Sequence, residues 1–331
     1  MEFLYEYGLF LAKTATLVLA IGLVIGLIAG AAAAKNKAKK GQLQFTDLSE
    51  HYQSMAEDMQ QHLLQKKQFK QWQKTQRAAR QDNRPKLFVL DFNGSLDAKE
   101  TESLREEVTA ILAVANQEDE VLLRLESGGG VVHGYGLAAS QLDRLRQHPL
   151  NLTVAIDKVA ASGGYMMACI GNTILAAPFA IVGSIGVIAQ LPNFNKLLKK
   201  HSVDFEQFTA GEYKRTVTLF GENTDKGRQK FQHELEDTHQ LFKQFVLQHR
   251  PQLDIDKVAT GEHWFGHQAL ALNLVDTIQT SDDYILTQMS QRQVFQVKYQ
   301  LRKGIAEKVG MGSASIVSHY WQRLIQHSWI R

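Results

Sequence analysis

Ser162 has the residue type and the surroundings of a catalytic nucleophile. It lies in the segment Ala160–Tyr165 (AASGGY), inside a stretch without charged residues that extends from Val159 to Asn195. A glycine directly after a nucleophile lets the substrate approach, and its N–H can donate a hydrogen bond to an oxyanion. A small serine also fits a packed core, so a base and an oxyanion site are needed before chemistry is indicated.

The candidate base is Lys214, in the segment Ala210–Arg215 (AGEYKR). A lysine acts as a general base only when its pKa falls from about 10.4 towards about 7–8, and this requires an apolar site that excludes water. The uncharged stretch around Ser162 could form such a site. Arg215 could assist by charge repulsion if it lay close by.

A Ser–His–Asp triad is the alternative arrangement for Ser162. His133 or His148 would be the base, and Asp157 would orient it. The chain holds 12 histidines, and no spacing singles out either of these two. We therefore expect the lysine to be the base.

Ser127–Gly130 (SGGG) follows an apolar segment that reads as a strand. No Gly-Lys-Ser/Thr follows, so this is not a P-loop, and the glycines do not fit the GxGxxG pattern. Glycines after a strand leave backbone N–H groups open to an oxyanion or a phosphate. A plain tight turn is the other interpretation.

Apolar segments alternate with helical ones around these motifs, and this alternation predicts an α/β domain with a buried sheet. The stretch 159–195 is interrupted by Asn172, Pro178 and Pro192 and by glycines, so it predicts a packed core of short elements and not a membrane span. The predicted strands are 86–91, 121–126 and 152–156, and the predicted helices are 100–115, 132–146 and 225–250.

The N-terminal residues predict a single membrane span over about 8–34. From Tyr7 to Ala34 the only charged residue is Lys13, and about 20 apolar residues suffice to cross a bilayer. The run is too long for a signal peptide, whose basic start is here replaced by Glu2 and Glu6. Glycines at positions 22, 26 and 30 would allow a second helix to pack closely.

The chain divides into four parts: a membrane-anchor segment (1–34), a basic helical linker region (35–84), the α/β domain that holds Ser162 and Lys214 (85–285) and a basic C-terminal tail (286–331). We expect a polar helix over about 45–80. It is either a solvated linker or a basic amphipathic surface on anionic lipid. Nucleic-acid binding is not expected, since no recognised module surrounds the basic residues and the net charge is only +3.

Cys169 is the only cysteine of the chain, so an internal disulfide or a cysteine-based zinc site is excluded. It lies in the apolar stretch, where we expect it to pack.

Together, four motifs resemble the signal peptide peptidase A family of membrane-anchored serine proteases. They are the strand-end SGGG at 127–130, ASGGY at 161–165, VGSIG at 182–186, and GEYK at 211–214, with Lys214 placed 52 positions after Ser162. Their order and spacing agree with that family over nearly the whole chain. One departure is Gly128, where many relatives have a proline, and it removes a fixed φ from the loop.

The resemblance implies a fold similar to the Clp protease and crotonase superfamily, with a Ser/Lys dyad. Ser162 matches the nucleophile, Lys214 the general base and Ser184 the residue that orients the lysine. Gly129 and Gly163 match the oxyanion donors. No metal or cofactor is implied.

The resemblance also implies a homo-oligomeric ring or dome in the bacterial inner membrane that degrades signal peptides or unfolded and membrane-associated polypeptides. Relatives act on the periplasmic side, whereas the lysines after the span favour a cytoplasmic domain. A non-catalytic scaffold on the same fold and a crotonase-type acyl-thioester enzyme are the competing hypotheses.

Overall fold

The computed structural model describes residues 6–21, 41–79 and 84–300. The chain separates into two units, of which the larger, Leu43–Tyr299, contains both sheets. Residues 6–21 form an exposed helix in the other unit. No helix among the described residues combines the length and the apolar character needed to cross a membrane. The second half of the predicted span, 22–34, lies outside the described residues.

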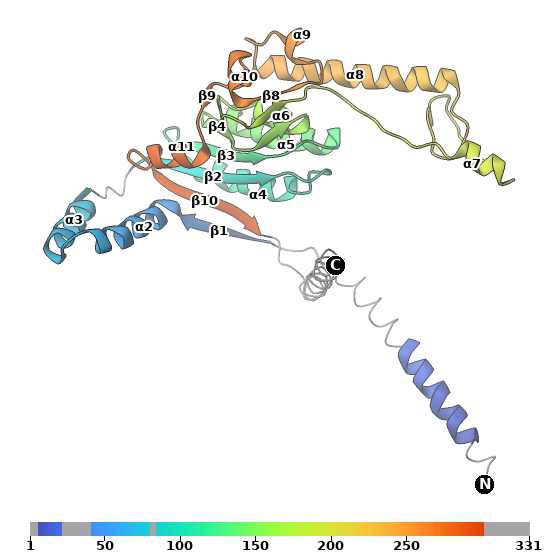
Figure 1. The fold of residues 1–331 in the computed structure, drawn as a ribbon, viewed down its shortest axis with the longest axis horizontal. Helices are drawn as coiled ribbons and strands as arrows, with labels where there is room; N and C mark the ends of the chain where they lie inside the picture. The colour runs from blue at the N-terminus through green and yellow to red at the C-terminus, as the bar shows by residue number, and fades with distance from the viewer. Residues whose placement is uncertain (1–5, 22–40, 80–83, 301–331) are drawn as a thin grey trace, which may run out of the picture. The chain divides into compact units, whose positions relative to one another are not determined.

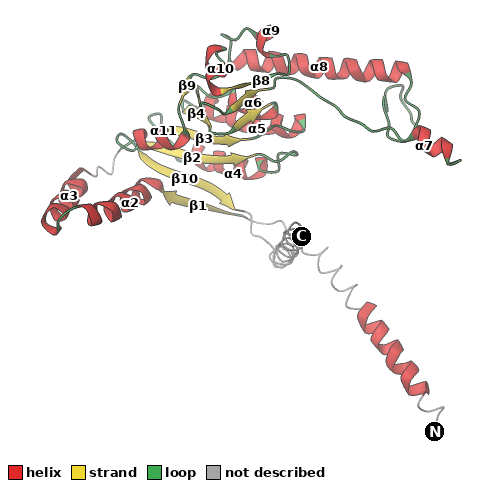
Figure 2. Cartoon of the chain, viewed as in Figure 1, coloured by secondary structure: helices red, strands yellow, loops and turns green. Residues whose placement is uncertain are grey.

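A seven-stranded sheet forms the centre of the larger unit, and it runs parallel from β10 to β9 (Figures 1 and 2). This confirms the predicted α/β class. The strand order is β1 (Gln42–Asp47), β10 (Gln293–Gln300), β2 (Lys86–Asn93), β3 (Glu120–Glu126), β4 (Asn151–Ile156), β6 (Thr173–Ala176) and β9 (Thr277–Ile278). The sheet thus takes one strand from before residue 85 and one from after residue 285.

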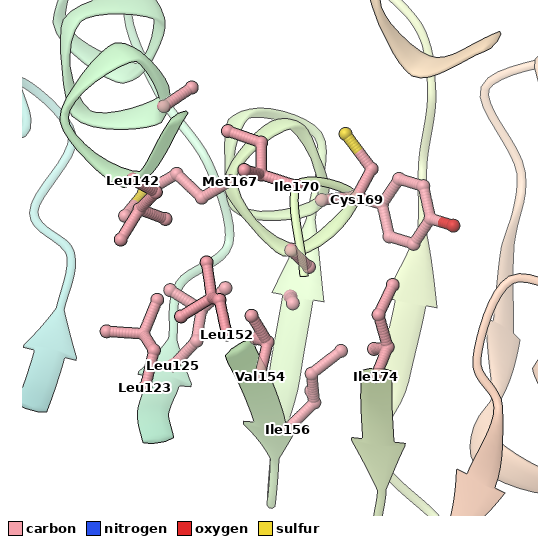
Figure 3. Close-up of a cluster of buried hydrophobic side chains, with 14 of the residues drawn as sticks. Leu123, Leu125, Leu142, Leu152, Val154, Ile156, Met167, Cys169, Ile170 and Ile174 are labelled. Atoms are coloured by element: carbon pink, nitrogen blue, oxygen red, sulfur yellow. The ribbon is translucent and has the colours of Figure 1, made fainter. Parts of the chain in front are cut away.

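Both faces of this sheet are buried, and this explains why its strands are apolar without alternation. In β2, Phe88 and Leu90 enter the larger core, whereas Leu87 and Val89 enter a smaller core on the other face. Figure 3 shows the larger core, where side chains of β3 and β4 meet those of α5 and α6. The flanking helices include α4 (Thr101–Leu112), α5 (Val132–Gln147), α6 (Gly163–Ala168) and α11 (Ser281–Gln288).

A second, three-stranded sheet positions the candidate nucleophile. Its order is β5 (Val159–Ala161), β7 (Ile181–Gly183) and β8 (His263–Phe265). β5 and β7 are parallel, with Ala161 opposite Gly183, so the next residues of the two strands, Ser162 and Ser184, leave the sheet side by side. The uncharged stretch therefore begins as short strands and turns of a packed core, as predicted.

After β7 the chain leaves the core as a long arm, residues 187–224 (Figure 1). The arm contains α7 (Asn195–Lys200) and returns to α8 (Asp225–His249). Asn193, near the start of the arm, links it to the end of the arm by donating hydrogen bonds to the carbonyl oxygens of Thr218 and Gly221 at 2.9 and 3.0 Å. Two short helices, α9 (Ile255–Val258) and α10 (Gly266–Ala271), follow α8.

The segment predicted to be helical over about 45–80 is mostly helical, but it is not one continuous helix. The segment forms the end of β1, then α2 (Leu48–Leu63) and α3 (Lys66–Ala79). Asp47 caps α2 by accepting a hydrogen bond from the Glu50 N–H at 2.9 Å, and Leu64 adopts an extended conformation that ends it. Polar composition gave no sign of this break, since glutamine and lysine favour a helix throughout.

Candidate active site

Ser162 stands at the junction of β5 and α6 with a positive φ of 53°. Such a backbone is uncommon for a residue with a side chain, and it concentrates at functional sites. The Ser162 N–H donates to the carbonyl of Gly183 at 2.8 Å, and its carbonyl accepts from Met166 in α6 at 3.0 Å. The backbone is thus held at both ends. The half-buried hydroxyl has no hydrogen-bond partner among the described residues.

Two glycines after Ser162 allow α6 to lie against the glycine-rich loop that follows β3. A Cβ on Gly163 would be 2.5 Å from the ring of Tyr135, and one on Gly164 would be 2.5 Å from the carbonyl oxygen of Ser127. On the loop, Gly129 has a φ of 85°, and a Cβ there would be 2.7 Å from the Gly163 nitrogen. The two predicted oxyanion donors, Gly129 and Gly163, are therefore neighbours beside Ser162.

Tyr135 and Ser127 hold this loop through a chain of hydrogen bonds that the sequence motifs do not reveal. The Tyr135 hydroxyl donates to the Ser95 carbonyl at 2.9 Å, so the Ser127 hydroxyl, 2.5 Å away, donates to Tyr135. The Ser127 oxygen in turn accepts the Gly129 N–H at 3.0 Å. Burial raises the pKa of Tyr135, which keeps it a neutral donor. Gly129 thus has an internal partner that an oxyanion would have to share or replace.

Ser184 also has a positive φ, 51°, and its N–H donates to the Glu262 carbonyl at 2.6 Å. The preceding residue, Gly183, packs against Trp264, whose ring would lie 2.8 Å from a Cβ at that position. The structure therefore places Ser184 next to Ser162, as their positions after paired strands require.

A mostly apolar cavity of about 370 Å³ opens beside Ser162. Its walls come from the glycine-rich loop, α5, α6, the segment after Ser184, and α8. Met166 contributes from α6, and Leu241, Phe242 and Phe245 contribute from α8. These α8 residues were not anticipated, because a long charged helix gives little sign of which apolar residues will face a site formed by distant segments.

Lys214 is not brought to Ser162 within this chain. It is exposed on the arm and lines a different cavity, with Phe208 and Leu219. Its neighbour Glu212 pairs with Lys226 in the first turn of α8 at 2.6 Å, whereas the Ser162 cavity meets α8 at Thr238. Twelve residues of helix separate these two points, which is about 18 Å at 1.5 Å per residue.

The alternative triad is not assembled either. Asp157 accepts hydrogen bonds from the N–H and the hydroxyl of Ser281 at 2.8 and 2.6 Å, and no contact among the described residues links it to a histidine. His133 is exposed on the first turn of α5, and His148 follows the last turn of that helix.

Cys169 is fully buried in the core behind α6, and its thiol donates to the Met166 carbonyl at 3.3 Å. Burial raises the pKa of this thiol to about 12, so it is not a nucleophile at neutral pH. The prediction that Cys169 packs is confirmed (Figure 3).

Comparison with known proteins places the sequence in one family along nearly its full length. Residues 2–142 match the model for "Peptidase family S49 N-terminal", and residues 144–295 match that for "Peptidase family S49". The chain is 54% identical to "Probable protease SohB" of Haemophilus influenzae, over 93% of this chain and 92% of that protein. It is 49% identical to "Probable protease SohB" of Buchnera aphidicola subsp. Schlechtendalia chinensis, over 87% of this chain and all of that protein. The chain belongs to peptidase family S49.

Proposed function

We propose that this chain is a membrane-anchored serine endopeptidase in which Ser162 is the nucleophile and Lys214 the general base. The observation that carries the proposal is the placement of Ser162. It has a positive φ at the start of a helix, its hydroxyl lacks a partner among the described residues, and it borders an apolar cavity. Membership of a peptidase family supports hydrolysis of peptide bonds.

In the proposed reaction, the neutral amine of Lys214 removes the proton from Ser162 as the serine oxygen attacks the scissile carbonyl carbon. The N–H groups of Gly163 and Gly129 donate hydrogen bonds that stabilise the negative charge on the carbonyl oxygen. The protonated amine passes its proton to the leaving nitrogen as the C–N bond breaks. Water, deprotonated by the same lysine, then hydrolyses the acyl-enzyme and frees Ser162.

The dyad would be completed between two copies of the chain. Lys214 lies on an arm that leaves the core, and Glu212 on that arm pairs with Lys226, about 18 Å along α8 from the cavity residue Thr238. The arm carries exposed apolar residues, including Ile188 at 79% and Phe208 at 89%, which a neighbouring copy would bury. Enclosure against a neighbour would also remove the water that keeps a lysine protonated. A homo-oligomeric ring or dome provides such neighbours.

The substrate we propose is an extended polypeptide, such as a released signal peptide or an unfolded membrane-associated chain. The cavity beside Ser162 offers Met166, Leu241 and Phe245 to an apolar side chain. The span over about 8–34 would anchor the enzyme in the bacterial inner membrane. A reporter enzyme fused to the C-terminus would report on which side the catalytic domain lies.

The proposal is tested by replacing Ser162 and Lys214 separately with alanine and measuring peptide hydrolysis and labelling by a serine-directed phosphonate. We expect both variants to lose hydrolysis and Ser162→Ala to lose the label. Ser290→Ala and Lys200→Ala, which alter the same residue types away from the cavity, serve as controls. Undiminished labelling of Ser162→Ala would show that another residue is the nucleophile. Hydrolysis unaffected by either change would refute the dyad, whereas a wild-type protein that neither hydrolyses peptides nor takes the label would support the non-catalytic scaffold.

A further inference from the structure

α3 presents lysines on one face. Lys66, Lys67, Lys70 and Lys74 all fall within about 100° of the helix circumference at 100° per residue. All four are exposed, and none forms an ion pair with a carboxylate among the described residues. α3 contains no acidic residue, so its positive charge is not balanced on the helix itself.

The partner helix α2 adds an exposed apolar stripe. Met55, Met59 and Leu63 recur every four residues and are 53%, 64% and 70% exposed. On α3, Phe69 and Trp72 stack at 6.1 Å and are half-buried beside the lysine face. Exposed lysines on one helix and an uncovered apolar stripe on the next are the side chains that bind lipid headgroups and the boundary of the acyl chains.

The length of the chain also allows this contact. Seven residues separate the end of the proposed span at Ala34 from the start of β1 at Gln42, and they reach at most about 25 Å. α2 and α3 are about 24 and 21 Å long. The start of β1 is therefore within about 25 Å of the membrane surface, and α2 begins directly after this six-residue strand.

We propose that the helix pair α2–α3 docks on an anionic bilayer surface, with the lysine face of α3 against lipid phosphates and the α2 stripe at the acyl boundary. This inference rests on the membrane anchor of the proposed function, and it is independent of the Ser162 chemistry. Docking would hold the catalytic domain close to the membrane, where membrane-associated polypeptides emerge.

The test uses the full chain in lipid nanodiscs with an environment-sensitive dye on α3. Cys169 is replaced by alanine, and the dye is attached through Gln71→Cys, an exposed position beside the lysine face. Discs of phosphatidylcholine alone are compared with discs that also contain phosphatidylglycerol. We expect a blue shift only with phosphatidylglycerol, and we expect high salt to abolish it.

A matched pair of variants identifies the cause. Lys70→Gln with Lys74→Gln should lower the ratio of docked to undocked helix about 30-fold, because each lysine near an anionic surface contributes about a factor of five. Lys196→Gln with Lys200→Gln on α7 removes the same charge at the same spacing and should change nothing. Met59→Gln with Leu63→Gln tests the apolar stripe and should also weaken docking.

Three results would overturn docking: an equal shift in both kinds of disc, an equal loss with the α7 variant, or a shift that appears only when nucleic acid is added. Failure of the chain to enter discs would instead refute the anchor. The same dye would then be read with added phosphatidylglycerol vesicles, where absence of a shift refutes docking as well.

Discussion

The hydroxyl of Tyr135 offers a single-atom test of how the proposed oxyanion site is held. Tyr135→Phe keeps the ring that packs against Gly163 but removes the hydrogen bonds to Ser95 and Ser127. The Ser95 carbonyl loses its donor, and the buried Ser127 hydroxyl loses its acceptor. At about 1 kcal/mol for each bond, with a further penalty for buried groups left unpaired, unfolding should become easier by about 2–3 kcal/mol.

Catalysis should change separately from stability. Loss of a whole oxyanion donor costs about 10²–10³ in kcat. Loosening the loop that carries Gly129 should cost less, and we expect kcat for peptide hydrolysis to fall about tenfold with little change in KM. Urea unfolding and steady-state kinetics are measured on the same preparations.

Tyr284→Phe is the matched control for this prediction. Its hydroxyl also bonds buried groups, on Thr153 and Glu120, but it lies away from Ser162. It should lose stability and keep kcat. If Tyr135→Phe lost stability in the same way and kept its kcat, the hydroxyl would not position the loop.

Three further changes test other parts of the structure. Burial raises the pKa of Glu107 from 4.5 to about 7, and nearby Asp91 adds to the rise. The folded state thus binds this proton more tightly, and about 3 kcal/mol of stability present below pH 4.5 is lost as the pH rises through 7. Glu107→Gln should flatten that part of the urea-unfolding profile against pH, and an unchanged slope would contradict it. Gly163→Ala, whose Cβ would overlap the Tyr135 ring, should cost about 1–3 kcal/mol and most of the activity. Gly136→Ala, in open space on α5, should instead gain about 0.5–1 kcal/mol, and equal melting of the two variants would refute the packing argument.

Much of the α/β unit could be predicted because its strands and helices have strong local patterns. β2, β3 and β4 are apolar runs bounded by polar turns, and α5 and α8 begin and end within a few residues of their predicted limits. β1 and β10 could not be predicted as parts of this sheet. Their pairing joins segments about 250 residues apart, and neither has a marked apolar run.

The candidate site was also predicted only in part. Ser162, Gly163, Gly129 and Ser184 were grouped through the family resemblance, and the structure gives the physical reason, because each directly follows or lies in a loop after a strand. The arm that carries Lys214 away from them could not be predicted, since its sequence has neither strong periodicity nor breaks that fix its direction. Tyr135 was missed because a tyrosine inside a helix reads as an ordinary core residue, and only the structure shows its hydroxyl bound to Ser127.

The most direct test of the account is to mix two inactive variants, Ser162→Ala and Lys214→Ala. A copy that keeps Ser162 would meet a neighbour that keeps Lys214 at about one site in four in randomly mixed oligomers. After co-expression or subunit exchange, we expect peptide hydrolysis to recover to about a quarter of the wild-type rate. If both variants fold and assemble but every mixture stays inactive, a dyad completed between copies is wrong.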